Sequence, residues 1–129
     1  MDIRISLSDG VPIYQQIVTQ IRYLVAAGRL KPGVELLPIR ALAEKLQVNP
    51  NTVARAYREL AQEGTVEKRS TKGTFVTDSG CRLATRHRQS VLHERIDQLL
   101  AESKQLGFTH EQLLEQIRNR TRVMNRKQA

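Results

Sequence analysis

The sequence has little of what several classes of protein require. It contains one cysteine, Cys81, so no disulfide can form within the chain, and this usage is typical of a reducing compartment. Tryptophan is absent and aromatic residues make up 4% of the chain, so stacking surfaces for single-stranded nucleic acid are not expected. No run of about 18 apolar residues predicts a membrane span, and the first residues lack the apolar core of a signal peptide. We therefore expect a cytoplasmic protein.

Acidic residues are also few relative to basic ones. The chain has 21 Lys and Arg against 13 Asp and Glu, which gives a net charge of +8. Such an excess predicts a polyanionic partner. Both halves of the chain are basic, so the charge alone does not separate nucleic acid from an anionic lipid surface. The positions of the charges in the predicted elements must distinguish these two partners.

The stretch from residue 39 to residue 77 has the strongest pattern in the chain. It predicts a helix over 39–46, a tight turn, a second helix over 50–63 and a hairpin over 65–77. Asn49 is a favourable N-cap, and the proline after it falls at the first helical position, where its missing N–H costs nothing. This order of elements is typical of a winged helix-turn-helix.

The second of these helices has one apolar face and one polar face. Four apolar residues with helical spacing predict the buried face: Val53, Ala56, Tyr57 and Leu60. The opposite face carries Asn51, Arg55, Arg58 and Gln62. Asn and Arg can make paired hydrogen bonds to base edges in the major groove. An ordinary amphipathic surface helix has the same stripe, so the flanking elements favour the DNA-reading interpretation.

Several motifs in the right order resemble a known family. They are Leu37–Ala43, Val48–Val53, the glycine at 64 and Gly73–Val76. Together they resemble the winged helix-turn-helix of the GntR family of bacterial transcription factors over residues 11 to 77. The run Asn-Pro-Asn-Thr-Val-Ala-Arg-Ala-Tyr, with a short C-terminal tail, is similar to the YtrA-like subfamily.

The resemblance implies a mainly α fold with a small β-hairpin wing, an α+β arrangement. It implies a DNA-binding domain over residues 1–78 and a two-helix dimerisation tail over 79–129. The implied function is a sequence-specific regulator, a repressor acting as a homodimer on a two-fold operator in double-stranded DNA. The residues and the resemblance together predict these DNA-binding positions: Arg40, Asn49, Asn51, Thr52, Arg55, Arg58, Arg69, Lys72 and Gly73.

The chain departs from the family pattern at three positions. Much of the family has basic residues where this chain has Pro50 and Ala54, so Arg55 and Asn51 are the nearest replacements and the preferred DNA sequence should differ. Family members usually carry a serine where this chain has Ile39. If that serine is an N-cap, Ile39→Ser should stabilise the helix start by about 1 kcal/mol.

The tail has two predicted helices. The first covers residues 83–105, and its apolar side carries Val91, Leu92, Ile96, Leu99 and Leu100. After a break at Gly107, the run Thr109–Gln112 resembles a capping box that opens the second helix. Two helices are too few to form a core. Their apolar faces should pack on the first domain or on a second copy.

Other kinds of site are not supported. The spacing of Cys81, His87 and His93 matches no usual zinc pattern, and no cofactor or catalytic motif is present, so we expect neither a metal site nor an enzyme. A small pocket beside the tail or at a dimer seam could hold an effector. Two alternatives stay open: a binder of nucleic acid that uses charge alone, and a protein-interaction module whose basic face no longer reads DNA.

Overall fold

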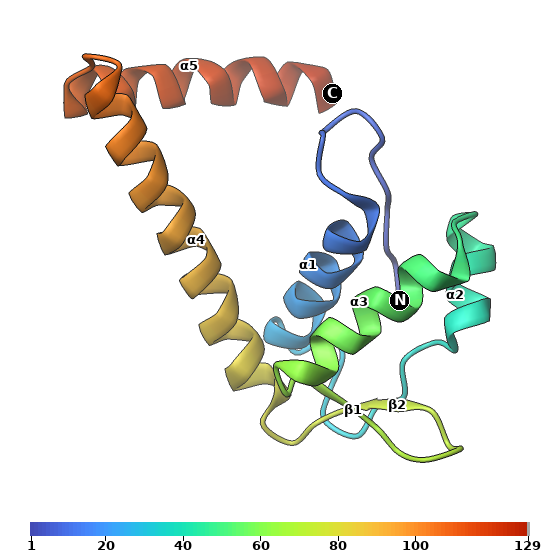
Figure 1. The fold of residues 1–129 in the computed structure, drawn as a ribbon. Helices are drawn as coiled ribbons and strands as arrows, with labels where there is room; N and C mark the ends of the chain where they lie inside the picture. Colours follow the sequence, from blue (N-terminus) through green and yellow to red (C-terminus); the bar gives the residue numbers. More distant parts are fainter. Residues whose placement is uncertain (129) are drawn as a thin grey trace. The chain divides into compact units, whose positions relative to one another are not determined.

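The computed structural model describes residues 1–128, with the side chains of residues 1–126. In chain order its elements are α1 (Ile13–Ala26), α2 (Ile39–Leu46), α3 (Pro50–Gln62), β1 (Val66–Lys68), β2 (Thr74–Val76), α4 (Gly80–Gln105) and α5 (His110–Gln128) (Figure 1). The predicted fold class, mainly α with a small β-hairpin wing, is confirmed. None of the described helices is long and apolar enough to cross a membrane.

The chain forms two compact units, and the division falls inside α4. The first unit is Met1–Gln89, and the second starts at residue 90. The predicted boundary after residue 78 concerns function, and it stays a prediction. α4 therefore contributes residues to both units.

The core of the first unit is built from the apolar stripes of its helices. α3 packs against both α1 and α2. The buried apolar residues of this core are Ile3, Ile17, Val18, Ile21, Val25, Leu36, Leu42, Ala43, Val53, Ala56, Tyr57, Leu60, Val66, Val76 and Ala84. The four residues predicted for the buried face of α3 are all among them, so the opposite face of α3 lies outside.

The tight turn between α2 and α3 has the geometry that a helix-turn-helix needs. α2 ends at Gln47, which takes the left-handed conformation with φ of 57°. The backbone N–H of Val48 then donates to the carbonyl of Ala43 at 3.0 Å and closes the turn. The Tyr57 hydroxyl donates to the Leu37 carbonyl at 2.6 Å, and burial raises the pKa of this phenol above its usual value. These bonds fix α3 relative to α2.

α2 begins at residue 39 as predicted, but the prediction that position 39 is its N-cap is wrong. The N-cap of this helix is Pro38, which has no side-chain capping bond, and Ile39 is the first helical residue. Ile39 is half-buried and packs against the core. A serine at position 39 would therefore lose apolar burial without reaching the capping position.

The wing is a short antiparallel hairpin supported by a third segment. Val66 pairs with Val76 and Lys68 with Thr74. The segment before α2 lies on the free side of β2, because the N–H of Leu36 donates to the Thr74 carbonyl at 2.8 Å. The wing is thereby joined to the chain that leads into the helix-turn-helix.

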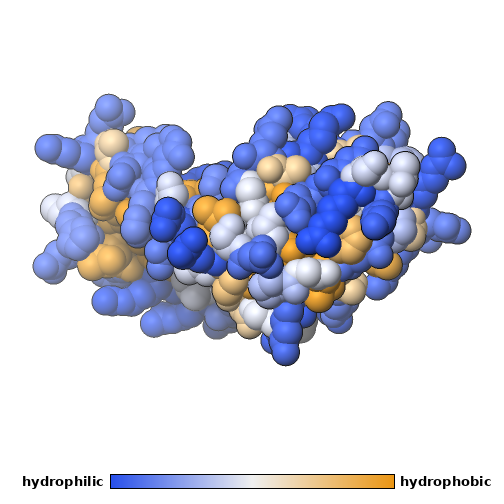
Figure 2. Space-filling model, turned by 90° about the horizontal axis from the view of Figure 1, so that it is seen from below, coloured by the Kyte–Doolittle hydropathy of each residue, from blue (hydrophilic) through white to orange (hydrophobic). Residues whose placement is uncertain are grey.

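The two tail helices occur in the predicted order, but the first of them starts earlier than predicted. α4 begins at Gly80 rather than at residue 83. The predicted capping box of α5 is confirmed: the N–H of Thr109 donates to Gln112 Oε1 at 2.9 Å, and the N–H of Gln112 donates to Thr109 Oγ1 at 3.2 Å. Many large apolar side chains of this unit are exposed, and Figure 2 shows hydrophobic residues in orange at the left, where α4 and α5 join.

Candidate nucleic-acid interface

α3 presents a polar face to the outside along its whole length. Asn51, Arg55 and Arg58 are exposed, while Thr52 is half-buried. Asn49 caps the helix, because its Oδ1 accepts a hydrogen bond from the backbone N–H of Asn51 at 2.8 Å. The cap uses the side-chain oxygen of Asn49 and leaves its amide nitrogen as a donor. The N-terminal half of α3 therefore offers several donors on one exposed face.

Arg40 is exposed in the first turn of α2. Because α2 packs on α3 and the turn between them is fixed, the first turn of α2, which carries Arg40, has a fixed position relative to α3. Such a position suits a contact beside the base-reading helix.

Arg55 has a partner that the sequence did not reveal. Its guanidinium carbon lies 3.7 Å from the centroid of the Tyr14 ring, which belongs to α1. Helical periodicity does not report which residue of one helix meets which residue of another, so no sequence signal identifies this pair.

The wing carries three of the predicted positions, and they differ in their surroundings. Arg69 donates from Nε to Glu67 Oε1 at 3.0 Å, and its guanidinium carbon lies 4.5 Å from the centroid of the Phe75 ring. Lys72 is exposed at the tip. Gly73 has φ of +117°, a conformation that side-chain-bearing residues rarely adopt. The tip is therefore shaped by its glycine, and the Lys72 ammonium has no hydrogen-bond or ion-pair partner among the described residues.

A network of charged groups fixes the other end of α3. Arg22 on α1 donates from Nε and Nη2 to the Glu63 carboxylate at 2.8 and 2.7 Å, and both side chains are 10% exposed. The Thr65 hydroxyl donates to the same carboxylate at 3.0 Å, and His87 Nε2 of α4 lies 3.1 Å from it. His87, considered above as a metal ligand, instead faces this carboxylate. The network joins α1, the C-terminal end of α3 and the first half of α4.

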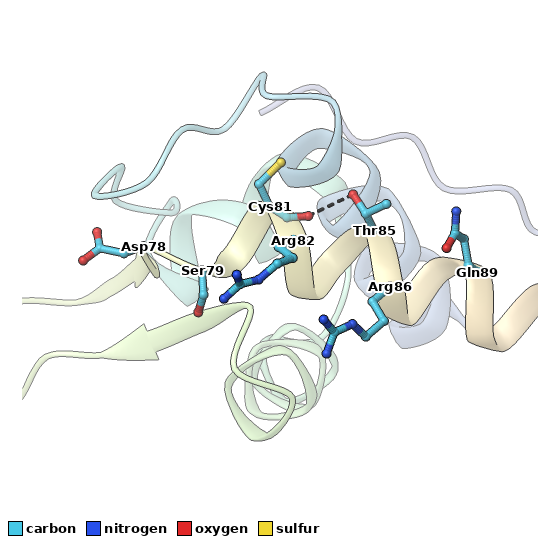
Figure 3. A pocket seen from close by; sticks show the side chains of 7 residues that line it. All are labelled: Asp78, Ser79, Cys81, Arg82, Thr85, Arg86 and Gln89. Atoms are coloured by element: carbon cyan, nitrogen blue, oxygen red, sulfur yellow. Dashed lines mark hydrogen bonds between the residues drawn. The ribbon is translucent and has the colours of Figure 1, made fainter.

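An open groove lies along the first turns of α4, with a volume of about 720 Å³. Its lining residues are Asp78, Ser79, Cys81, Arg82, Thr85, Arg86 and Gln89 (Figure 3). The Thr85 hydroxyl donates to the Cys81 carbonyl at 2.9 Å, so it is used within the helix. Among the described residues, no three His, Cys, Asp or Glu side chains gather in a way that could hold a metal ion. The groove does not identify an effector, so the effector stays a prediction.

Comparison with known proteins points to one family. The sequence profile of "Bacterial regulatory proteins, gntR family" matches residues 13–76. The HTH-type transcriptional repressor YtrA of Bacillus subtilis is 34% identical over 116 residues, which cover 90% of this chain and 89% of that protein.

Two solved structures are similar over most of the chain. A GntR family transcriptional regulator from Listeria monocytogenes superposes with a TM-score of 0.69 and 29% identity, covering 88% of this chain and 98% of that one. YtrA from Sulfolobus acidocaldarius, a GntR-family transcription factor, has a TM-score of 0.62 and 38% identity, covering 77% of this chain and 97% of that one. The chain thus belongs to the GntR family, in its YtrA-like subfamily, and is a DNA-binding transcriptional regulator rather than an enzyme.

Proposed function

We propose that this regulator is a repressor that binds a two-fold operator as a homodimer. One observation carries the proposal: α3 is capped by Asn49 at its N-terminus and keeps Asn51, Arg55 and Arg58 exposed opposite a fully packed stripe. A helix held in this way can enter the major groove with its polar face toward the bases. The operator lies on the chromosome, so the protein acts in the cytoplasm.

The flanking contacts come from α2 and the wing in this proposal. Arg40 reaches the phosphate backbone beside α3, and Lys72 reaches it from the wing tip. Gly73 allows the backbone of the tip to approach the DNA closely. Asn51 and Thr52 lie in the first turns of α3, where base edges are within reach. Phosphate contacts set the orientation, and base contacts set the sequence.

The exposed apolar side chains of the second unit support the homodimer. On α4 and α5 these are Leu92, Ile96, Leu99, Leu100, Leu114, Ile117 and Met124, and the connection between the two helices adds Leu106 and Phe108. The large number of such residues on two helices predicts a covering partner. A second copy is the occupant that suits a protein binding a two-fold site. The name of the Bacillus relative supports repression, which a dimer can exert by blocking the promoter.

The test is a mobility shift on the DNA upstream of the protein's own gene, with excess unrelated DNA and a series of salt concentrations. We expect a discrete complex that survives the competitor, and Arg40→Ala should weaken it about tenfold because one charged contact is lost. The matched control is Arg29→Ala, which removes the same charge from an exposed position after α1 and should leave the affinity unchanged. A smear that disappears at modest salt would instead identify a binder that uses charge alone.

The dimer is tested separately by sedimentation. Leu99→Glu places a carboxylate in the exposed apolar face of α4 and should convert the dimer to a monomer. Gln98→Glu adds the same charge to an adjacent exposed position and should leave the dimer intact. A wild-type monomer at micromolar concentration would contradict the proposed assembly.

A further inference from the structure

The stacked pair of Tyr14 and Arg55 has an unusually close geometry for this molecule. The distance of 3.7 Å from the guanidinium carbon to the ring centroid corresponds to van der Waals contact. The other arginines near aromatic rings in the described structure lie at 4.5, 5.1 and 5.8 Å. Tyr14 is half-buried in α1, so its ring is a fixed surface, whereas Arg55 is exposed.

The stack occupies the face of the guanidinium and leaves its edge available. Among the described residues, no hydrogen bond or ion pair joins Arg55 to another protein group, Glu59 included, although Glu59 is one turn further along the helix. The N–H groups of a guanidinium point outward in its plane. Arg55 thus keeps its donors while its side chain is held in one orientation.

The position of Arg55 on α3 indicates which part of the DNA it meets. It lies 40° around the helix from Asn51, by 100° per residue, on the side that faces α1. The stack with Tyr14 holds the guanidinium toward that side, away from Ala54 on the opposite flank. A donor at the rim of a recognition helix suits a backbone phosphate more than a base edge.

We propose that Tyr14 is a positioning residue for DNA binding, which holds Arg55 so that its guanidinium edge contacts a backbone phosphate. The inference rests on the proposed function. An arginine side chain that is already ordered loses less rotamer freedom when it binds. The pair supplies a charged contact next to positions 50 and 54, where this chain has no basic residue.

The experiment measures the affinity of the full chain for its operator and for unrelated duplex DNA at several salt concentrations. Tyr14→Leu, which removes the ring, should lower the affinity about fivefold, while Tyr14→Phe should keep it within about twofold. The phenylalanine retains the stacking face, and among the described residues the Tyr14 hydroxyl has only a 3.5 Å contact with Gln15 Nε2. Tyr23→Leu removes an exposed ring elsewhere on α1 and should have no effect.

The double variant separates positioning from an effect on folding. Arg55→Ala should lower the affinity about tenfold on both DNAs and reduce the salt slope by about one. Tyr14→Leu added to Arg55→Ala should then cost nothing more, because the group that it positions is gone. Equal thermal unfolding of Tyr14→Phe and Tyr14→Leu would show that the difference in affinity does not come from stability.

Three results would overturn the inference. They are a Tyr14→Leu protein with wild-type affinity, a Tyr14→Leu loss of the same size in the Arg55→Ala background, and an Arg55→Ala loss confined to the operator, which would indicate a base contact. Each result presumes that the wild-type protein binds its operator. If the wild-type protein forms no specific complex, the proposed function itself fails, and the two failures are therefore distinguishable.

Discussion

The two compact units treat their apolar residues in opposite ways. In the first unit, Met1–Gln89, the apolar stripes of three helices, the hairpin and the start of α4 meet in one core. In the second unit no described residue belongs to that core, and Leu106 is 74% exposed. Ser103 is the one described residue from 90 onward that is buried. The first unit therefore covers most of its large apolar side chains, whereas many of those in the second unit are exposed in the described structure.

The charged groups follow the same division. Among the described side chains, every ion pair lies in the first unit, and the tightest, Arg22 with Glu63, is almost fully buried. The second unit holds none within the described side chains, although it is rich in arginine and glutamate. A buried pair needs a packed surround, which only the first unit provides. The pair therefore fixes the C-terminal end of α3 within the packed first unit.

The largest difference between the units should appear when matched isoleucines are truncated. Ile21 is fully buried in α1, and Ile21→Ala should lower the free energy of unfolding by about 2–5 kcal/mol because it leaves a cavity. Ile96 on α4 is 42% exposed, and Ile96→Ala should cost less than about 1 kcal/mol within one copy. Urea unfolding at a concentration where the protein is monomeric measures both.

The same two variants test whether the apolar side chains of the tail are uncovered within one copy. Ile96→Ala should weaken the self-association measured by sedimentation, whereas Ile21→Ala should act on stability first. If Ile96→Ala destabilises the monomer as much as Ile21→Ala, then the apolar side chains of the tail are covered within one copy. The second unit would then need no partner.

A smaller effect is expected from the buried charge network. Glu63→Ala leaves the Arg22 guanidinium without its carboxylate at a site where both side chains are 10% exposed, and it should cost about 3 kcal/mol. Glu67→Ala, in the wing, removes a pair whose side chains are 47% and 51% exposed, and it should cost about 0.5 kcal/mol or less. Thermal unfolding distinguishes the two. Equal losses would show that Arg22 finds another acceptor when Glu63 is absent.

Much of the fold could be predicted from the sequence because local signals agree there. The bounds of α2 match the prediction, and α3 differs from it by one residue. Asn49, Pro50 and the glycine at 64, which has φ of +84°, mark the ends of α3 through their own backbone chemistry. The capping box at Thr109 is likewise local. Such features depend on residues three or four apart, which a single sequence displays directly.

The contacts that the sequence did not reveal join residues far apart in the chain. Arg22 and Glu63 are 41 positions apart. Tyr14 lies on α1 and Arg55 on α3, and each residue by itself looks like a member of an ordinary amphipathic face. The positions of the polar face of α3 could be predicted, but which of its arginines is held in place could not. That depends on the register in which α1 packs on α3.

The smallest expected effect concerns the N-cap of α2. Pro38 is exposed at the N-cap, and its carbonyl already accepts the bond from the Leu42 N–H at 3.0 Å. Pro38→Ser adds a hydroxyl that can accept from a free N–H of the first turn, a gain of about 1 kcal/mol, but it gives up about 0.5 kcal/mol of proline rigidity. The free energy of unfolding should therefore rise by about 0.5 kcal/mol.

Ile39→Ser is the variant to compare with Pro38→Ser. Ile39→Ser should lower the free energy of unfolding by about 1 kcal/mol, because Ile39 packs on the core of the first unit and lies one residue past the cap. Urea titration of the two variants should thus give opposite signs at neighbouring positions. Stabilisation by Ile39→Ser would mean that the helix starts one residue later in solution. Ile39 would then contribute little to the core of the first unit, and the start of α2 would be loosely packed.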